Sequence, residues 1–374
     1  MIADDCGRPR PIPLLFFVSG LISLLGGCSQ APVVASHSPM HPDNSQAVTF
    51  VGSAEGQVDR IDLSYERYSL SAVGGVLTQT LAQADTVVKS CNPAGSSSSL
   101  TCSHTMPSAF PANSLIKFTA KAYDSDNKSS TESYFFASGD YPLPDDPIPI
   151  RVKGDPPEKL DVVFIRDTDI TASSFASQLD EVIDDLYFKY DPIKFWRGTY
   201  NFYYSGESGN YEELCSFTNP SNMANLLAVA DTVAFLHQTD LRDCRSGTRM
   251  SSEIDYDKTL IHETGHALFG MADEYCCDSS YFQQACEPNL WSSLAGCQTD
   301  ASGIGYPSSD CTQLTNGSDS INFWRIDPSG TGGCIMGPRQ HSADSQFAKA
   351  CGNRMSFRIG KCLGGDCFPT PECP

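Results

Sequence analysis

The chain is short of basic residues and of long hydrophobic runs. It carries 25 Lys and Arg against 45 Asp and Glu, which gives a formal net charge of −20. Nucleic acids and anionic lipid surfaces attract proteins through clustered basic residues, so this charge argues against both as partners. No apolar run approaches the roughly 20 residues that a membrane-spanning helix needs. No two cysteines have the C-x-x-C spacing of a structural zinc finger, and no internal repeat is present.

The longest apolar run, Leu14–Leu25, follows two arginines and has the length of a signal-peptide core. It ends in Leu25-Gly26-Gly27-Cys28, which resembles the lipobox of bacterial lipoproteins. The resemblance implies that residues 1–27 are removed and that Cys28 is lipidated. Ser29 stands where an aspartate would signal inner-membrane retention, which favours the outer membrane or cell surface. The alternative is a conventional cleaved signal followed by a chance cysteine.

The 16 cysteines support export. Cys6 leaves with the predicted signal and Cys28 takes the lipid, so 14 remain in the mature chain. An even number of this size in an exported protein predicts up to seven disulfides. The pairing does not follow from the sequence, although Cys91 and Cys102 flank a serine run and are placed to close one loop.

The mature chain is predicted to divide into two domains. Residues 28–46 are predicted to be a flexible tether, and residues 47–140 contain short alternating or aromatic-rich runs without a sustained helical period. These runs predict an all-β sandwich of the Ig-like or fibronectin-like kind. The predicted strands include Val48–Val51, Arg60–Tyr65, Leu115–Ala120 and Ser133–Phe136. Asp124 and Asp126 are either calcium ligands or part of a polar hairpin turn, and the turn is the better-supported interpretation.

A proline-rich stretch, residues 141–157, is predicted to link the β domain to a second domain over residues 158–374. The second domain alternates strand and helix patterns, which predicts an α/β (α+β) core followed by a cysteine-rich, loop-heavy C-terminal half. The spacing predicts a helix over Ser173–Tyr190, strands at Leu160–Ile165, Tyr200–Tyr204 and Thr232–Leu236, and a short helix at Met223–Ala230. His237, directly after the last of these strands, is expected to be structural.

The most informative stretch is His262-Glu263-Thr264-Gly265-His266. On a helix the two histidines lie four residues apart, so their imidazoles project from one face and both reach one zinc ion. Glu263 is placed to touch a zinc-bound water, to take its proton as general base and to pass it to the leaving amine. A surface helix that carries two histidines by chance is the alternative, and the export signals count against it.

A catalytic zinc needs a third protein ligand and one open position. In metzincins, which this motif resembles, the helix ends at a glycine and the third ligand lies three residues beyond it. Gly270 is placed to end the helix, and three residues on is Asp273. The departures are one extra residue before the glycine and an aspartate in place of histidine. Glu274 is the rival ligand; because neighbours in an extended segment point in opposite directions, only one of the two should bind, and Asp273 is favoured.

Farther along, Gly333–Pro338 resembles the Met-turn of metzincins, in which Met336 forms a hydrophobic floor beneath the zinc. The same likeness implies a bridge between Cys334 and Cys351. His341, near this turn, is a candidate for contact with the substrate or the oxyanion, although a solvent-exposed histidine is the simpler interpretation.

Residues 160–275 resemble the IgA-peptidase family of bacterial zinc metallopeptidases. The likeness rests on three segments, Asp161–Asp167, Tyr200–Gly209 and His262–Tyr275. The third extends well past the generic zinc-peptidase motif and is the most specific, whereas the first departs from the family pattern at Arg166. The resemblance implies a metzincin-like fold in which His262 and His266 bind zinc, Glu263 is the base, Asp273 or Glu274 completes the site, and Tyr275 lines it.

Together these patterns predict an exported zinc endopeptidase that hydrolyses peptide bonds of a protein or peptide substrate with one catalytic Zn²⁺. It is expected in the bacterial cell envelope, at the outer membrane or cell surface, and to meet the membrane only through the lipid on Cys28. A lipoprotein binding or adhesion module with an inactive zinc-peptidase domain is the alternative from another class. A third possibility is that residues 47–157 form a removable pro-segment. Neither the cleaved bond nor the oligomeric state follows from the sequence.

Overall fold

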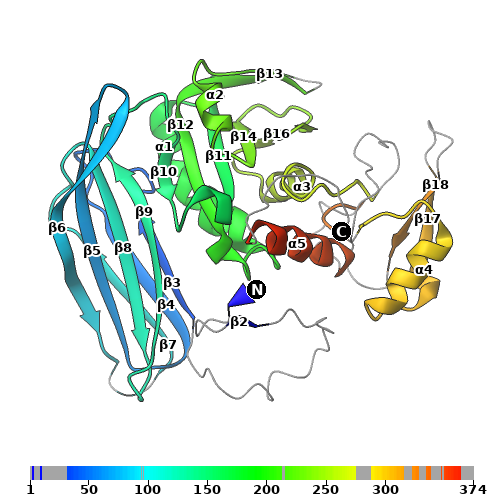
Figure 1. Cartoon of the computed structure of the whole chain (residues 1–374), viewed down its shortest axis with the longest axis horizontal. Helices are drawn as coiled ribbons and strands as arrows, with labels where there is room; N and C mark the ends of the chain where they lie inside the picture. The colour runs from blue at the N-terminus through cyan, green and yellow to red at the C-terminus, as the bar shows by residue number, and fades with distance from the viewer. Residues whose placement is uncertain are drawn as a thin grey trace.

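The structure is a computed structural model that describes residues 2–3, 9–10, 32–93, 95, 97–212, 215–274, 288–315, 322–327, 334–337, 347 and 349–363. Cys28, Tyr275 and His341 lie outside these ranges. Figure 1 shows a β domain at one end of the molecule, an α/β domain in the middle, and a small lobe of α4 (Leu294–Gly303), β17 (Cys311–Thr315) and β18 (Asn322–Ile326) at the other end. Within the described ranges, no helix is long and apolar enough to cross a membrane.

The β domain consists of two antiparallel sheets that share one core. Phe50 from one sheet stacks on Phe118 from the other, with ring centroids 4.4 Å apart. The first sheet has the order β3 (Val33–Ser38), β4 (Thr49–Val58), β7 (Ser97–Thr105), and the second has the order β6 (Val76–Cys91), β5 (Arg60–Val73), β8 (Ser114–Tyr123), β9 (Ser129–Ser138). Two short strands near the N-terminus, β1 (Ile2–Ala3) and β2 (Pro9–Arg10), pair only with each other.

The four predicted strands correspond to β4, β5, β8 and β9, each of which is longer than the predicted run; Val48 alone lies outside, one residue before β4. Strands β6 and β7 were not predicted. Both lie at the edge of their sheets, are largely exposed, and lack a clear alternation of buried and exposed residues. The predicted disulfide between Cys91 and Cys102 is confirmed and joins β6 to β7. The Asp124 side chain accepts hydrogen bonds from the backbone N–H groups of Asp126 and Lys128, both at 2.9 Å, as expected of a polar hairpin turn.

Two segments predicted to be connections are parts of sheets. The tether prediction for residues 28–46 is wrong from Val33 onward, because β3 pairs with β4 and buries Val33 and Ala35 in the core. The linker prediction for residues 141–157 is wrong over β10 (Ile148–Arg151), which forms the edge of the central sheet of the α/β domain. In both segments a few alternating apolar residues pair with a neighbouring strand. The proline and serine content, on which the tether and linker predictions rested, does not indicate this pairing.

The α/β domain is built on a sheet that is mainly parallel. Strands β12 (Tyr200–Glu212), β11 (Leu160–Asp167), β14 (Thr232–His237) and β16 (Arg249–Glu253) are adjacent and parallel, while β10, β13 (Ser216–Thr218) and β15 (Arg245–Ser246) are antiparallel to their neighbours. Alternate residues of β11 enter different cores, with Val162 and Phe164 on one face and Val163 and Ile165 on the other. Burial of both faces explains the continuous apolar run that predicted this strand.

The helices cover this sheet and extend past it. The predicted helix over residues 173–190 is confirmed in extent, although it is α-helical only over α1 (Ala172–Asp180) and continues as a π-helix (Glu181–Leu186) and a 3-10 turn (Tyr187–Lys189). The remaining helices are α2 (Met223–Leu227), α3 (Asp257–Ala267), α4 (Leu294–Gly303) and α5 (Lys349–Cys362), with 3-10 turns at Pro156–Glu158, Arg197–Thr199 and Ser308–Asp310. Strands β17 (Cys311–Thr315) and β18 (Asn322–Ile326) form a hairpin, and a disulfide from Cys297 to Cys311 holds α4 against it.

The two domains are joined by backbone and charged contacts. Phe135 in β9 and Val152, directly after β10, exchange two backbone hydrogen bonds, at 2.8 and 2.9 Å. Arg151, fully buried, donates to both oxygens of Asp184 at 2.7 and 2.9 Å. Glu132 of β9 forms an ion pair with Lys153 of the second domain. The β domain is therefore packed against the α/β domain as a structural partner.

Candidate metal centre

Helix α3 and the chain that follows it bring the predicted ligands together. The helix ends at Ala267, and Gly270 adopts a left-handed conformation with φ of 61°. A residue with a side chain is strained there, so glycine lets the chain reverse. The N–H of Met271 then donates to the carbonyl of Gly265 at 3.0 Å, which turns Asp273 back toward the helix. The predicted function of the glycine as a helix stop is confirmed.

Three ligand-type atoms form a nearly equilateral triangle. Nε2 of His262 lies 3.0 Å from Nε2 of His266, and each is 3.1 Å from Oδ1 of Asp273. All three side chains are buried. Two ligands bound to one tetrahedral zinc at about 2.0–2.1 Å lie about 3.3 Å from each other. The triangle is therefore close to the size that a single zinc ion requires.

The second nitrogen of each histidine fixes the orientation of the ring. Nδ1 of His262 faces the carbonyl of Ile335 at 2.9 Å, and Nδ1 of His266 faces the carbonyl of Met271 at 2.8 Å. A carbonyl oxygen only accepts, so both Nδ1 atoms carry hydrogen and both Nε2 atoms point into the triangle. Backbone carbonyls in this position are the usual support for histidines that bind a metal.

The electrostatics of the triangle favour a cation. Burial by itself would lower the pKa of His262, but the hydrogen bond with Asp273 and the charges of Glu263 and Asp273 outweigh it and raise the pKa to about 9. Burial would raise the pKa of Asp273, yet its contacts with the two histidines hold that pKa far below the usual range. The acidic groups thus stabilise positive charge at the point where the three ligand atoms meet.

Glu263 is buried beside the triangle and has an unused oxygen. Its side chain is 5% exposed, and Oε2 has no hydrogen-bond partner among the described residues. Burial raises the pKa of this carboxyl group. A buried carboxylate that no protein donor satisfies is costly unless a ligand or water reaches it. This is the arrangement that a general base needs.

Glu274 points away from the triangle. Its Oε1 accepts from Nδ2 of Asn289 at 3.2 Å and from the thiol of Cys351 at 3.1 Å. The structure thus places Asp273, and not its neighbour, with the two histidines, as the alternation of an extended segment predicts.

Cys334 and Cys351 are buried beside each other as free thiols, with sulfur atoms 2.7 Å apart. The bridge implied by the family resemblance is therefore absent from the structure, although the two residues are neighbours. With Glu274 they form a second group of metal-ligand types. Two sulfurs bound to one zinc at about 2.3 Å would lie about 3.8 Å apart, so this spacing does not fit a zinc ion.

Met336 packs directly beneath the motif helix. It is fully buried, and its carbonyl accepts from the N–H of Glu274 at 2.6 Å. A side-chain carbon added to Gly265 would lie 2.5 Å from Sδ of Met336, so only glycine fits at that point of α3. The tight turn from Cys334 to Gly337, closed by a hydrogen bond of 2.8 Å, holds this methionine in place. Met336 thus packs against the helix that carries His262 and His266, and its function as a floor beneath a zinc ion stays a prediction.

A pocket of about 620 Å³ opens beside the triangle, and Glu263 and His262 form part of its wall. The rest comes from the segment after β14, the end of β16 and the start of α3. Its further lining residues are Gln238, Asp240, Leu241, Arg242, Asp243, Glu253, Asp255, Tyr256 and Thr259. The size is in the range of ligand-binding clefts.

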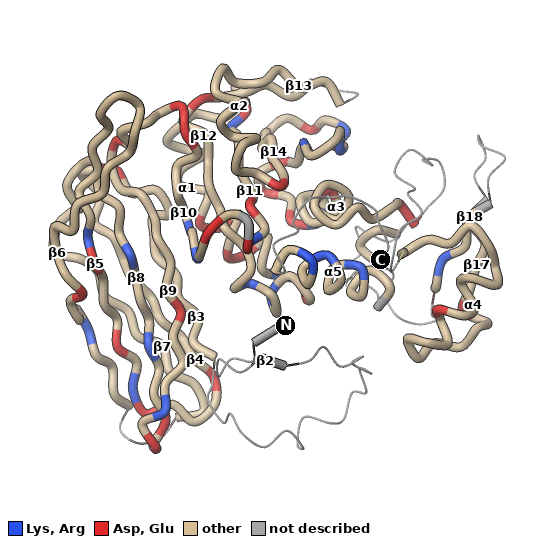
Figure 2. Tube along the Cα trace, viewed as in Figure 1, with Lys and Arg blue, Asp and Glu red and all other residues tan. Residues whose placement is uncertain are grey.

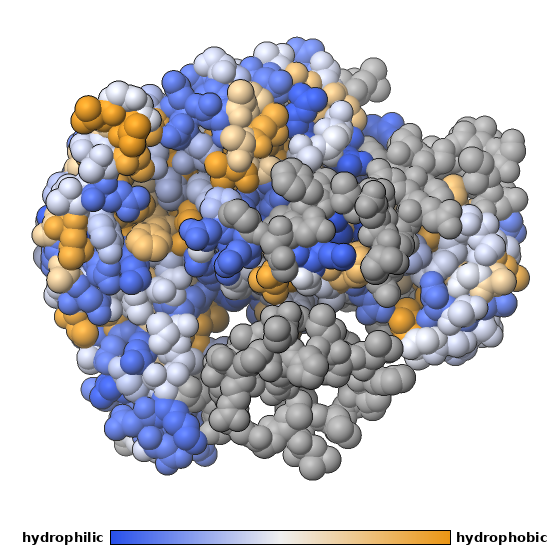
Figure 3. Space-filling view, viewed as in Figure 1, coloured by the Kyte–Doolittle hydropathy of each residue, from blue (hydrophilic) through white to orange (hydrophobic). Residues whose placement is uncertain are grey.

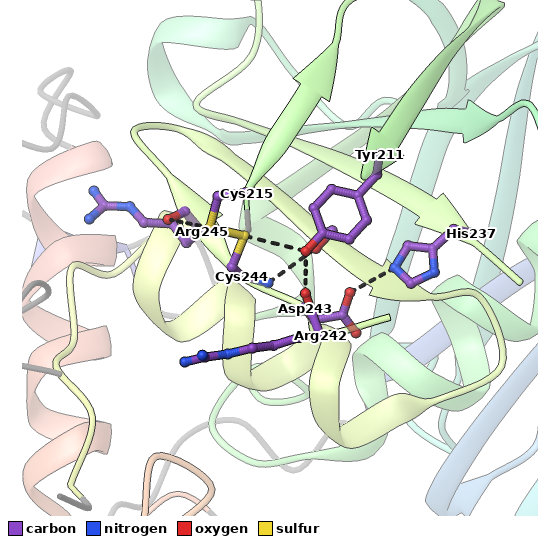
Figure 4. The surroundings of a disulfide bond; sticks show 8 residues. Tyr211, Cys215, His237, Arg242, Asp243, Cys244 and Arg245 are labelled. Carbon is purple, nitrogen blue, oxygen red and sulfur yellow. Dashed lines mark hydrogen bonds and ion pairs between the residues drawn. A yellow bond between two sulfur atoms is a disulfide. The ribbon is translucent and has the colours of Figure 1, made fainter. Parts of the chain in front are cut away.

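One wall of the pocket is stabilised by a buried network around Asp243 (Figure 4). Asp243 forms an ion pair with Nε2 of His237 at 2.7 Å, and Nδ1 of His237 faces the carbonyl of Thr239 at 2.8 Å. Tyr211 stacks on the His237 ring, with centroids 5.1 Å apart, and donates its hydroxyl to the carbonyl of Arg242. A disulfide between Cys215 and Cys244 closes the same region. His237 is structural, as expected.

Glu253 faces the same network. Burial and its hydrogen bond with Asp243 raise the pKa of Glu253 to about 8, so the two carboxyl groups share a proton near neutral pH. Asp243 and Glu253 were missed by sequence reasoning. They lie on different strands and loops, and the only available signal was their position at the carboxyl ends of neighbouring parallel strands, where sites in such sheets gather.

Comparisons with known proteins add no assignment. No family model and no curated protein matches the chain. The chain is similar to the sporulation control protein Spo0M of Bacillus subtilis at 9% identity and a TM-score of 0.21, over 30% of this chain and 50% of that one. It is similar to the putative ApaA protein of Bordetella pertussis at 11% identity and a TM-score of 0.15, over 29% of this chain and 92% of that one.

A third similar structure is a β-glucuronidase of Bacteroides uniformis, at 12% identity and a TM-score of 0.19, over 55% of this chain and 23% of that one. The chain thus spans about half of Spo0M. TM-scores of this size do not establish a shared fold, and none of these likenesses bears on what the protein does.

Proposed function

We propose that the protein is a zinc-dependent endopeptidase with a metzincin-like centre, preceded by an Ig-like β domain. The observation that carries the proposal is the triangle of two Nε2 atoms and one carboxylate oxygen, with edges of 3.0 to 3.1 Å, beside the unused oxygen of Glu263. His262, His266 and Asp273 would hold the ion. When bound, zinc supplies Lewis acidity toward a peptide carbonyl and lowers the pKa of water.

The chain's own groups divide the remaining work. Glu263 accepts a proton from the attacking water at its Oε2 and delivers it to the amine nitrogen that leaves. The carbonyls of Ile335 and Met271 hold the two imidazoles, and burial of the site excludes competing water. The adjoining pocket accommodates the peptide next to the scissile bond.

The test compares the wild-type protein with Glu263→Gln. Both are purified without the first 27 residues, loaded with zinc, and incubated with an unfolded protein library whose fragments are sequenced by mass spectrometry. We expect one bound zinc in both proteins and new internal cleavage only with the wild type, because the amide of glutamine cannot take the proton. Zinc-loaded wild type that leaves the library intact would support the inactive binding module instead.

We also propose that the chain is exported and anchored through Cys28. Three disulfides among the described residues support an oxidising compartment, in which such bonds persist. Expression in a bacterial host with radiolabelled palmitate tests the anchor. We expect label in the wild-type protein and none in Cys28→Ser, and label in neither would refute the lipid.

A further inference from the structure

We propose that the pocket beside the metal centre selects peptides that carry a lysine or arginine next to the scissile bond. This inference rests on the proposed peptidase function and names the substrate class of that same site. It starts from the charges on the pocket wall, which has five carboxyl groups against one guanidinium, that of Arg242. Figure 2 shows acidic residues gathered around α3, while basic residues lie along α5.

Two of the five carboxyl groups are neutralised within the protein. Asp243 is paired with the buried His237 at 2.7 Å. Glu253 is hydrogen-bonded to Asp243, and the two carboxyl groups share one proton. These groups hold the wall in place and contribute little net charge to the pocket. Their role is to position the segment between Gln238 and Asp243.

Asp240 and Asp255 remain available to a ligand. Both are exposed, and neither side chain forms a hydrogen bond or ion pair with any other described residue. They come from different segments, the loop after β14 and the turn between β16 and α3. A cationic side chain in the pocket would therefore meet carboxylates from two sides, whereas an acidic side chain would be repelled by both.

Glu263 connects this charged pocket to the chemistry. It lines the pocket, is only 5% exposed, and its buried Oε2 has no hydrogen-bond partner in the described part of the chain. Whatever fills the pocket thus lies beside the group proposed to handle the proton of the attacking water. The side chain that the pocket accepts should belong to a residue close to the scissile bond.

The space also fits the proposed occupant. A pocket of about 620 Å³ accommodates the extended side chain of lysine or arginine together with part of the peptide backbone. Leu241 and Thr259 offer surface to the aliphatic part of such a side chain, and the exposed carboxylates receive its charged end. Arg242, also exposed, opposes this preference and sets its limit.

The experiment uses matched peptides with Lys, Arg, Gln or Glu at each of three positions on either side of a bond that the wild type cleaves. We expect kcat/KM at one position to be about tenfold or more higher for Lys or Arg than for Glu, and this ratio to fall at high salt because exposed charges are screened. Asp240→Asn and Asp255→Asn should each reduce the ratio about 3- to 10-fold, and Arg242→Gln should increase it. The exposed Asp85 of the β domain supplies the control, since Asp85→Asn should leave the ratio unchanged.

A binding measurement separates this inference from the proposed function. Glu263→Gln, alone and combined with Asp255→Asn, is titrated with the same peptides, and we expect the cationic series to bind more tightly than the acidic series, by a smaller factor when Asp255 is replaced. Cleavage or binding that is equal for Lys and Glu peptides, or a preference that survives both aspartate changes, would overturn the inference and leave the peptidase proposal standing. No cleavage by the wild type together with a charge preference in binding would overturn the peptidase proposal and support the pocket.

Discussion

The contact between Gly265 and Met336 yields a quantitative prediction about the metal centre. A methyl group in Gly265→Ala would lie 2.5 Å from Sδ and 3.2 Å from Cε of Met336. Favourable contacts between carbon atoms begin near about 3.5 Å, so the methionine must move by about 1 Å. It is fully buried, and its backbone is tied to Glu274 by a hydrogen bond of 2.6 Å. The side chain therefore has little room to yield.

Two opposing terms set the size of the effect. Overpacking of a close-packed core costs about 1–3 kcal/mol. Alanine in a helix is more favourable than glycine by about 1 kcal/mol. We expect Gly265→Ala to lower the free energy of unfolding by about 1 kcal/mol and to weaken zinc binding, because the methyl group pushes α3 away from the turn whose Ile335 carbonyl supports His262.

Urea unfolding, followed by tryptophan fluorescence with zinc and with chelator, measures this change. Gly352 in α5 is the matched control, because an added methyl there meets nothing within 4 Å. Gly352→Ala should gain up to about 1 kcal/mol from helix propensity. Met336→Ala alone should cost about 2–5 kcal/mol, and the double variant should be more stable than the sum of the two single changes predicts, by about 1–2 kcal/mol.

If Gly265→Ala gains stability as Gly352→Ala does, and the double variant is additive, the methionine does not support the helix. The proposed floor beneath the metal centre would then be wrong, even if the two histidines and Asp273 bind zinc.

The remaining predictions concern the third ligand, the domain interface and pH. Asp273→Asn should lower zinc affinity at least tenfold, measured by competition with a chelating dye, whereas Glu274→Gln should change it little; equal losses would contradict the assignment. Arg151→Met should cost about 2–3 kcal/mol and Asp184→Asn more, about 3–5 kcal/mol, because the second leaves a guanidinium with 0% exposure unpaired. Both variants should make the β domain susceptible to proteolysis. In the wild type, intact-mass measurement should show that the β domain is retained, and loss of residues 47–157 during maturation would support a pro-segment. Burial raises the pKa of Asp161 to about 8, so the folded protein keeps a proton that the unfolded chain loses above about pH 4. Unfolding free energy should therefore fall as pH rises from about 4 to about 8, and Asp161→Asn should flatten that slope in thermal melts.

One exposed feature remains without a partner in the described part of the chain. The β5–β6 hairpin ends in Val73 and Val76, which are 75% and 66% exposed, and Figure 3 shows hydrophobic atoms gathered at this end of the β domain. Exposed apolar residues on an edge strand attract other chains. Nothing in the structure identifies an occupant.

Much of the candidate metal centre could be predicted from the sequence because it is local. His262, Glu263 and His266 lie within two turns of one helix, and helical geometry alone brings the histidines to one face. Gly270 and Asp273 follow in the same short segment, where a left-handed glycine reverses the chain. Only the choice between two adjacent carboxylates needed the structure, and it depended on Asn289 and Cys351 holding Glu274 elsewhere.

The pocket and the domain interface could not be predicted in the same way. The pocket wall joins residues from the loop after β14, from β16 and from α3, and their proximity depends on how parallel strands are ordered in the sheet. The supposed tether and linker contain strands, because Val33 and Ile148 gain partners that lie far along the chain. Arg151 gave no sign in the sequence that it would be buried.

By itself, the sequence determined the residue types, their helical spacing and the glycine stop, which together predict where a zinc ion would be held. Local backbone geometry suffices for that, because the atoms concerned are at most 11 residues apart, from His262 to Asp273. The tertiary structure decided between Asp273 and Glu274, placed Met336 against Gly265, and brought acidic groups from separate segments to the border of one pocket. Those depend on long-range packing between segments whose relative position no local pattern encodes.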